Sequence, residues 1–318
     1  MSTPRVSAAP PLTARSSFRD LLRRIYANRT VYLFLAPSFL LMLMFSYYPF
    51  LSAIQHSFTR WTVGGVSNFV GLKNFIELAG DEIFLTALAN LLKLSAFAIV
   101  VNTTAPLFAA ELIFNLKSAR LQYFSRAMLV FPMVVPFIVM VLVWGFIYDA
   151  EVGIINQFLS LIGLESLRQA WLGDARFALL SMMFIGFPWV GGFSLLIYLS
   201  GLQAISAEIL DSALIDGANV FRRFWSIDLP MVLGQVKLIL ILSVITSLQS
   251  FGVQFILTEG GPGFATLVPG LYMYNMAFWY ARMGYATTIG FVLFILIFGL
   301  TYLNFRGIKV ETEYVARR

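Results

Sequence analysis

Long apolar stretches alternate with short polar ones along most of this chain, and most of the apolar stretches carry no charged residue. Each is long enough for a helix rising ~1.5 Å per residue to cross a hydrocarbon core of about 30 Å. The pattern predicts an all-α, polytopic membrane protein with about six transmembrane helices. One predicted helix, Ile83–Ala110, is interrupted only by Lys93. The charge-free runs are Val31–Gln55, Ala127–Tyr148, Phe177–Gln203, Leu238–Thr258 and Met283–Phe305.

The composition agrees with this class and excludes several chemistries. Hydrophobic residues make up 59% of the chain and charged residues 12%, against about 45–50% and about 25% in soluble domains. With no cysteine and one histidine, His56, neither a disulfide nor a histidine-cluster metal site is expected. No phosphate-binding G-x-x-x-x-G-K-[ST] loop and no constellation of catalytic side chains is present, so neither ATP hydrolysis nor another enzymatic activity is expected of this chain.

The distribution of basic residues predicts the topology. Arg and Lys concentrate before the first apolar run, in the second and fourth loops, and after the last run. Because six spans put both ends of the chain on one side, the positive-inside rule predicts that both termini are cytoplasmic. The predicted organisation is a cytoplasmic arm at 1–28, a transmembrane domain at 29–307 and a cytoplasmic tail at 308–318. The net charge of +6 then reflects topology and contact with lipid, and no nucleic-acid partner is expected.

Candidate binding residues lie inside two of the apolar runs. In GFPWVGG (186–192), Pro188 weakens the helix beside Trp189. An aromatic ring at mid-membrane suits a sugar, whose C–H faces stack on the ring while its hydroxyls bind amides and hydroxyls. Hydrogen bonding between helices is the alternative role for such polar groups. The run from Leu238 supplies uncharged polar groups at Ser243, Thr246, Ser247, Gln249, Ser250 and Gln254.

Proline in the third helix has two interpretations. Pro132 and Pro136 lie one turn apart in FPMVVPF (131–137). Proline removes a backbone donor and permits a kink. The sequence is equally consistent with a bent helix that serves only packing and with a helix that lines a pore.

A polar segment, Ser206–Pro230, lies between two of the most apolar runs. As a helix it would have Ser206 as its N-cap, a bend at Gly217 and an end at Pro230. The amphipathic pattern predicts that this helix forms a docking surface. The alternative is that the helix lies on the membrane or packs against its own domain. Its apolar stripe would contain Leu210, Ala213, Leu214, Gly217, Phe221 and Phe224.

The same segment carries a resemblance to a known family. Asp216, Gly217 and Ala218, followed by Phe224, Ile227, Leu229 and Pro230, resemble the EAA loop, the coupling helix of binding-protein-dependent ABC importer permeases. The sequence departs from the family pattern at Asp211 and Ser212, where Glu and Ala are usual. The resemblance to the carbohydrate class of this family extends from the first apolar run to Gly307, including Asn68–Leu78, Val152–Leu180 and LTEGGPGFAT (257–266).

The resemblance implies a type I permease fold in the bacterial cytoplasmic membrane. It implies as partners a second, related permease, two ATP-binding subunits and an extracytoplasmic sugar-binding protein. ATP and Mg would be bound by the partner ATPase, so no cofactor is expected in this chain. The residues that match the ATPase-coupling positions are Asp211, Asp216, Gly217, Ala218, Phe221, Phe224 and Pro230.

The resemblance also implies a sugar site at Trp189, Ser247, Gln249 and Ser250. A neutral sugar or oligosaccharide is the expected substrate. A phosphorylated or acidic substrate, such as glycerol phosphate, would require a basic residue facing the cavity, and Lys93 is the only intramembrane candidate. The alternative outside the class is an ATP-independent channel or facilitator, in which Ser206–Pro230 would be an interfacial helix.

Overall fold

The computed structural model describes residues 26–65 and 67–307, whose regular secondary structure is helical apart from one small hairpin. The hairpin pairs β1 (Thr59–Trp61) with β2 (Ser67–Phe69) in antiparallel register. The chain divides into two compact units between Ala53 and Ile54. The predicted arm lies almost wholly, and the predicted tail wholly, outside the described residues.

The first unit contains a continuous helical stretch at the start of the predicted first span. It consists of α2 (Arg29–Met42), a π-helical turn (Leu43–Tyr47) and the beginning of α3 (Tyr48–Ser57). None of the residues in α2 is buried within this chain. Such an apolar helix, exposed all round, is suited to lipid or to another protein.

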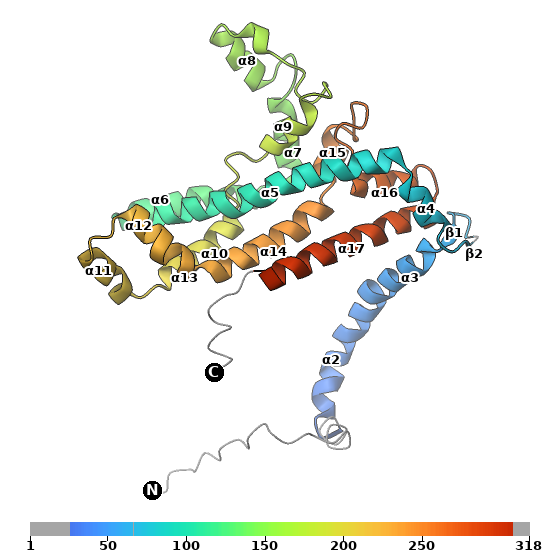
Figure 1. The fold of residues 1–318 in the computed structure, drawn as a ribbon, viewed down its shortest axis with the longest axis horizontal. Coiled ribbons are helices and arrows are strands. Elements are labelled where there is room, and N and C mark those ends of the chain that lie inside the picture. The colour runs from blue at the N-terminus through green and yellow to red at the C-terminus, as the bar shows by residue number, and fades with distance from the viewer. Residues whose placement is uncertain (1–25, 66, 308–318) are drawn as a thin grey trace. The chain divides into compact units, whose positions relative to one another are not determined.

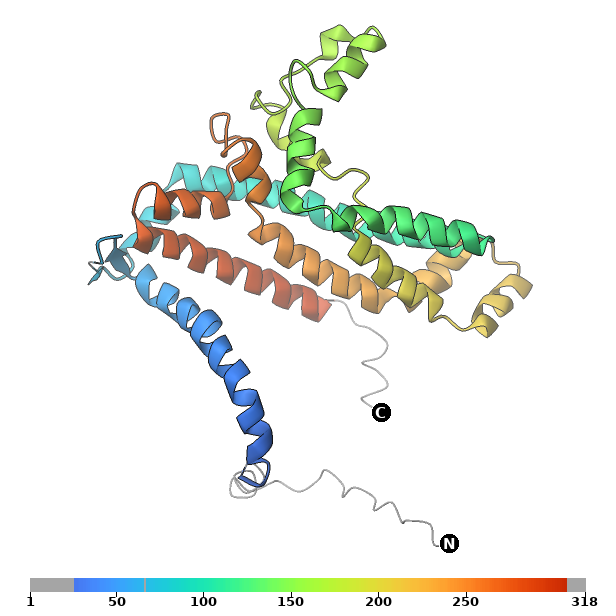
Figure 2. The same cartoon turned by 180° about the vertical axis from the view of Figure 1, so that it is seen from behind.

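The helix α5 (Glu82–Phe114) organises the second unit. Figure 1 shows α5, α14 (Leu233–Gln249) and α17 (Met283–Gly307) lying side by side, and contacts join α14 to both neighbours. One half of α5 packs with α14, α16 (Pro269–Phe278) and α17 around Leu91. The other half packs against α10 (Gly192–Gln203). This helix lies beside α5 and α6 (Ala119–Val130) in Figure 2. One rigid helix thus belongs to both hydrophobic cores.

Asp81 caps the start of α5 and ties it to two other helices. One carboxylate oxygen accepts hydrogen bonds from the backbone N–H groups of Ile83 and Phe84, at 2.9 and 3.1 Å. The other accepts from the hydroxyls of Tyr272 and Tyr285, each at 2.6 Å. Partial burial raises the pKa of Asp81, but these four hydrogen bonds together outweigh burial and hold the pKa below its usual value. The cap is therefore an ionised carboxylate at neutral pH.

Several predicted spans are present as helices. Among the described residues, four helices are long and apolar enough to cross a membrane, and up to six if each of two bent pairs counts as one span. The unbroken spans are Arg29–Ser57, Glu82–Phe114, Leu233–Leu257 and Met283–Asn304, and they correspond to four of the predicted runs. The fold class predicted from the hydrophobic pattern is confirmed.

The third predicted span is sharply bent. Its limbs, α6 with the following 3-10 turn (Ala119–Val134) and α7 (Phe137–Ile147), meet at 96°. Pro132 lies in the 3-10 turn and Pro136 precedes α7. The kink expected from the two prolines is present, and both residues are exposed at the bend.

The prediction of one continuous helix over Phe177–Gln203 is wrong. The helix α9 (Ala178–Phe184) ends before Ile185, and α10 begins only at Gly192. Between them, Gly186 and Trp189 adopt left-handed backbone conformations with φ of 85° and 58°. A helix cannot pass through such residues, and Pro188 lacks the donor needed to continue it.

A buried asparagine holds together the loop after α7. The side-chain amide of Asn156, in α8 (Ile154–Leu161), donates to the carbonyl oxygens of Ala150 and Gln169 at 2.9 and 2.8 Å. Its oxygen accepts from the indole N–H of Trp171 at 2.9 Å. This explains why the asparagine and the tryptophan occur together in this loop.

The remaining elements are short. The segment Asn68–Leu78, one of those that resemble the family, contains the end of β2 and most of α4 (Lys73–Ala79). The helix α15 (Gly252–Leu257) follows α14 after a break, and a 3-10 turn (Glu165–Leu167) follows α8. The polar segment contains α11 (Ala207–Ile215), α12 (Val220–Arg223), a π-helical turn (Phe224–Asp228) and α13 (Leu229–Met231).

Candidate functional site

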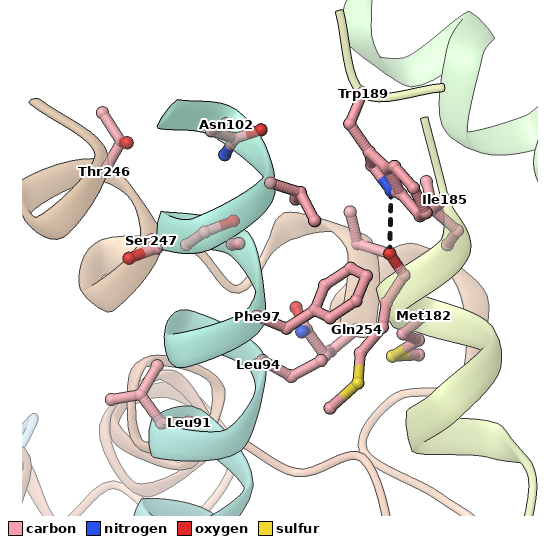
Figure 3. A pocket seen from close by; sticks show the side chains of 15 residues that line it. Leu91, Leu94, Phe97, Asn102, Met182, Ile185, Trp189, Thr246, Ser247 and Gln254 are labelled. Atoms are coloured by element: carbon pink, nitrogen blue, oxygen red, sulfur yellow. Dashed lines mark hydrogen bonds between the residues drawn. The ribbon is translucent and has the colours of Figure 1, made fainter. Parts of the chain in front are cut away.

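A cavity of about 300 Å³ lies between α5, the irregular stretch after α9, and the junction of α14 with α15. Figure 3 shows its walls, with α5 facing the irregular stretch that carries Trp189. The residues that line it are Leu91, Leu94, Phe97, Ala98, Val101, Asn102, Met182, Met183, Ile185, Trp189, Thr246, Ser247, Ser250, Val253 and Gln254. The cavity brings together three of the four predicted substrate residues: Trp189, Ser247 and Ser250.

One wall of the cavity is aromatic and firmly held. The indole N–H of Trp189 donates to the carbonyl oxygen of Met183 at 3.1 Å. Its ring meets Phe97 edge-on, with centroids 5.4 Å apart (Figure 3), and lies 5.5 Å from the ring of Phe184. Trp189 also has the left-handed φ of 58°, a conformation that costs a non-glycine residue about 1–2 kcal/mol. The break in the helix therefore turns a large ring into the cavity and fixes it there.

The opposite wall presents hydroxyl and amide groups. Thr246 and Ser247 donate their hydroxyl protons to carbonyl oxygens of Leu242 and Val244 in the same helix, which leaves their oxygens able to accept. Gln254 is 6% exposed, and its side-chain oxygen has no hydrogen-bond partner. A buried acceptor without a partner costs about 1–3 kcal/mol. This oxygen is thus available to a ligand that donates a hydrogen bond.

The described residues that line the cavity include no charged side chain. Lys93, the intramembrane cation noted in the sequence, is exposed and lies outside this lining. Lys237 is buried in α14 but is likewise not part of the lining. Gln249, the fourth predicted substrate residue, is exposed and does not line the cavity. Nothing in the lining therefore offers a counter-charge to an anionic ligand.

The Ser206–Pro230 segment is not the single helix that the sequence predicted. The helix α11 ends at Ile215, and Gly217 adopts a left-handed φ of 72°. A second helix starts at Val220, where the side chain of Asn219 accepts the backbone N–H of Arg222 at 2.8 Å. Ser206 occupies the N-cap position of α11, but its side chain accepts no backbone N–H there. The chain reverses at Gly217 because only a residue without a Cβ readily takes that conformation.

The break at Gly217 distributes the predicted apolar stripe over two surfaces. Ala213 and Phe224 are buried, and the ring of Phe224 packs against Phe108 of α5 with centroids 5.7 Å apart. Asp211, Asp216 and Pro230 are exposed, and Ala218 is half-buried. An apolar surface remains uncovered in this chain, and it is made of Leu214, Ile215, Val220, Phe221 and Trp225. We call these five residues the exposed apolar surface of the segment.

Residues 102–308 match the family of binding-protein-dependent transport system inner membrane components. The chain belongs to this family. The match covers the cavity walls on α9, α14 and α15 as well as the whole Ser206–Pro230 segment. The chain is therefore a permease, a multi-pass membrane protein and not an enzyme.

Individual family members resemble the chain over most of its length. The probable ABC transporter permease protein YurN of Bacillus subtilis is 32% identical over 89% of this chain and 97% of its own. The diacetylchitobiose uptake system permease protein NgcF of Streptomyces coelicolor is 32% identical over 92% of this chain and 86% of its own. In the crystal structure of a bacterial alginate ABC transporter, a chain with 21% identity superposes with a TM-score of 0.79, covering 89% of this chain and 95% of that one. At this identity the superposition establishes the permease fold alone.

The structure adds cavity residues that the sequence did not single out as substrate residues. Gln254 was visible as one of several polar groups in its run, but only the break between α14 and α15 determines which of these groups face the cavity. Asn102 and Phe97 come from α5, whose apolar run contains two amide side chains, Asn90 and Asn102, of which only Asn102 lines the cavity.

Proposed function

We propose that this permease carries an uncharged sugar or oligosaccharide across the cytoplasmic membrane as the transmembrane subunit of an ATP-driven importer. The observation that carries the proposal is the chemistry of the cavity, which combines a fixed aromatic ring, several hydroxyl and amide groups, and a lining without charge. A pyranose has apolar C–H faces and a rim of hydroxyls, so it complements both walls. The sugar relatives of the chain support the same substrate class.

Each wall has a defined role in this proposal. Trp189, supported by Phe97, stacks on a sugar ring. Ser247, Ser250 and Asn102 exchange hydrogen bonds with the hydroxyls, and the free oxygen of Gln254 accepts one. Because each neutral contact is modest, the site holds its cargo transiently, as a transport pathway requires. No counter-ion is needed for a neutral cargo.

The Ser206–Pro230 segment is the proposed attachment to the ATPase. The helices α11 and α12, which carry most of its exposed apolar surface, lie at the end of the unit opposite α4 and the hairpin (Figures 1 and 2). Apolar helical surfaces of this kind bind in grooves of partner proteins. In the proposal, two ATP-binding subunits bind ATP and Mg, one of them receives this surface, and a second permease completes the membrane domain. Asp211 and Asp216 are exposed beside the apolar surface and supply polar contacts at its rim.

The proposed orientation places both termini and this segment in the cytoplasm, following the basic residues of the loops. An extracytoplasmic sugar-binding protein delivers the cargo at the other side. A similar permease fold occurs in an alginate transporter whose crystal structure includes an alginate pentasaccharide-bound periplasmic protein.

The test is the ATPase activity of the reconstituted complex, with its partner permease, ATPase and binding protein, measured against a panel of neutral and acidic sugars. We expect stimulation by a neutral sugar that depends on the binding protein. Stimulation only by a phosphorylated or acidic sugar would overturn the assignment of an uncharged cargo. Absence of any coupling between sugar and ATP hydrolysis would instead favour a channel or facilitator.

A further inference from the structure

A buried polar cluster joins the Ser206–Pro230 segment to α5. The guanidinium of Arg223, in α12, contacts the carboxylate of Asp228 at 2.9 Å through Nε. Its Nη2 donates to the side-chain oxygen of Asn115 and lies 3.6 Å from a carboxylate oxygen of Glu111. Asn115 in turn donates to Glu111 at 2.6 Å. Two of these residues, Glu111 and Asn115, belong to the last turn and the C-cap of α5.

The cluster is shielded from water. The side chain of Asp228 is 0% exposed, that of Glu111 9% and that of Arg223 18%. The guanidinium also lies over the ring of Phe114, 5.6 Å from its centroid. Charge-assisted hydrogen bonds in such surroundings are short and directional, and the planar fork of arginine fixes their geometry. The contact between the segment and α5 therefore has a defined distance and direction.

The same helix reaches the cavity. Asn102, Phe97 and Leu91, which line the cavity, are carried by α5, and the helix continues without interruption to Glu111. Pro106 lies between Asn102 and Glu111 and removes one backbone hydrogen bond, yet α5 remains a single helix of 33 residues across it. A displacement of α12 at Arg223 would thus be transmitted along α5 to one wall of the cavity.

We propose that Arg223 is a positioning residue that transmits movement of the Ser206–Pro230 segment to α5, and so to the substrate cavity. The inference rests on the proposed function, because it requires an ATPase that moves the segment. Arg223 holds Asp228 within the segment on one side and Glu111 with Asn115 on the other. Phe224 adds an apolar contact with Phe108 beside it, which should preserve the folded contact between the segment and α5 when Arg223 is changed but does not fix its distance and direction.

The test uses Arg223→Met in the complete reconstituted complex, with sugar transport and ATP hydrolysis measured together. We expect ATP hydrolysis to continue while the sugar transported per ATP falls about tenfold, an effect within the range typical of coupling between sites. Arg223→Lys should retain an intermediate ratio, because it keeps the charge and loses the fork. Arg120→Met is the matched control, since Arg120 is an exposed residue of α6, and its ratio should equal that of the unchanged protein.

A second measurement separates transmission from folding. Because the chain has no cysteine, spin labels can be attached to single cysteines introduced at Leu112 of α5 and at Ser226, both exposed. Their separation should stay constant through the ATP cycle in the unchanged protein and vary with nucleotide in Arg223→Met. An unchanged transport ratio and a constant separation in this variant would overturn the proposal. If sugar does not stimulate ATP hydrolysis in the unchanged complex, the proposed function is refuted instead.

Discussion

Trp189 illustrates how a single residue combines backbone strain with a binding role. Its positive φ is uncommon for a bulky side chain, and the hydrogen bond to Met183 with three neighbouring aromatic rings maintains it. Strain of this kind persists when the surrounding structure fixes it, and it concentrates at functional sites. The strained residue here faces a cavity whose opposite wall presents polar groups.

Replacing Trp189 with Ala should weaken sugar-stimulated ATP hydrolysis more than basal hydrolysis. The loss of ring stacking is worth about 1.4 kcal/mol, which corresponds to about tenfold. Stimulated and basal rates of the reconstituted complex measure the effect, and Trp189→Phe, which keeps a ring, should lose less. An equal loss of both rates would point to misfolding.

Gln254 offers a test in which stability and transport change differently. Gln254→Met removes an oxygen that has no partner and keeps the length of the side chain. Because an unpaired buried polar atom is itself unfavourable, thermal stability without sugar should stay equal or rise. Transport should fall about tenfold, because the lost hydrogen bond to the sugar contributes about 1.4 kcal/mol. Unchanged transport would show that Gln254 does not bind the substrate.

At the scale of elements, the Ser206–Pro230 segment depends on its break. Gly217 lets α11 and α12 meet at an angle, and together they form the exposed apolar surface. A Cβ at Gly217 would meet no atom within 4 Å, so the backbone conformation rather than space requires glycine. The orientation of the two helices should therefore be sensitive to side chains that disfavour positive φ.

Gly217→Val should abolish transport while the protein still inserts in the membrane. A β-branched residue at φ of 72° carries a cost of about 1–2 kcal/mol or more, which favours a different turn. Gly217→Asn should retain most activity, because asparagine tolerates this conformation. Transport and membrane content are measured for both variants. Equal transport in the two would argue against a conformational requirement at this position.

Hydropathy predicted the unbroken elements well and the broken ones poorly. In the runs that became α5 and α17, length and apolarity agree with the structure, and α5 stays helical even across the buried Pro106. The run 177–203 was just as apolar, yet Gly186 and Trp189 interrupt it. Their left-handed conformations depend on tertiary contacts, which a hydropathy pattern does not contain.

At the scale of the whole molecule, the substrate site was predictable in part. Trp189, Ser247 and Ser250 followed from family resemblance and lie around one cavity, whereas Gln249 points elsewhere. Which face of α14 meets the cavity depends on the end of that helix at Gln249 and on packing against α5. The polar cluster at Arg223 involves residues more than a hundred positions apart in sequence, such as Asn115. A single sequence gives no indication of such a contact.

We propose that the cargo passes through the uncharged cavity by a process driven by ATP. The most direct measurement is uptake of the stimulating sugar into proteoliposomes that contain the full complex, with ATP and Mg on the side of the ATPase subunits. We predict accumulation against the concentration gradient that requires ATP and the binding protein. Equilibration of the sugar across the membrane without ATP would contradict ATP-driven transport and identify the chain as part of a facilitator.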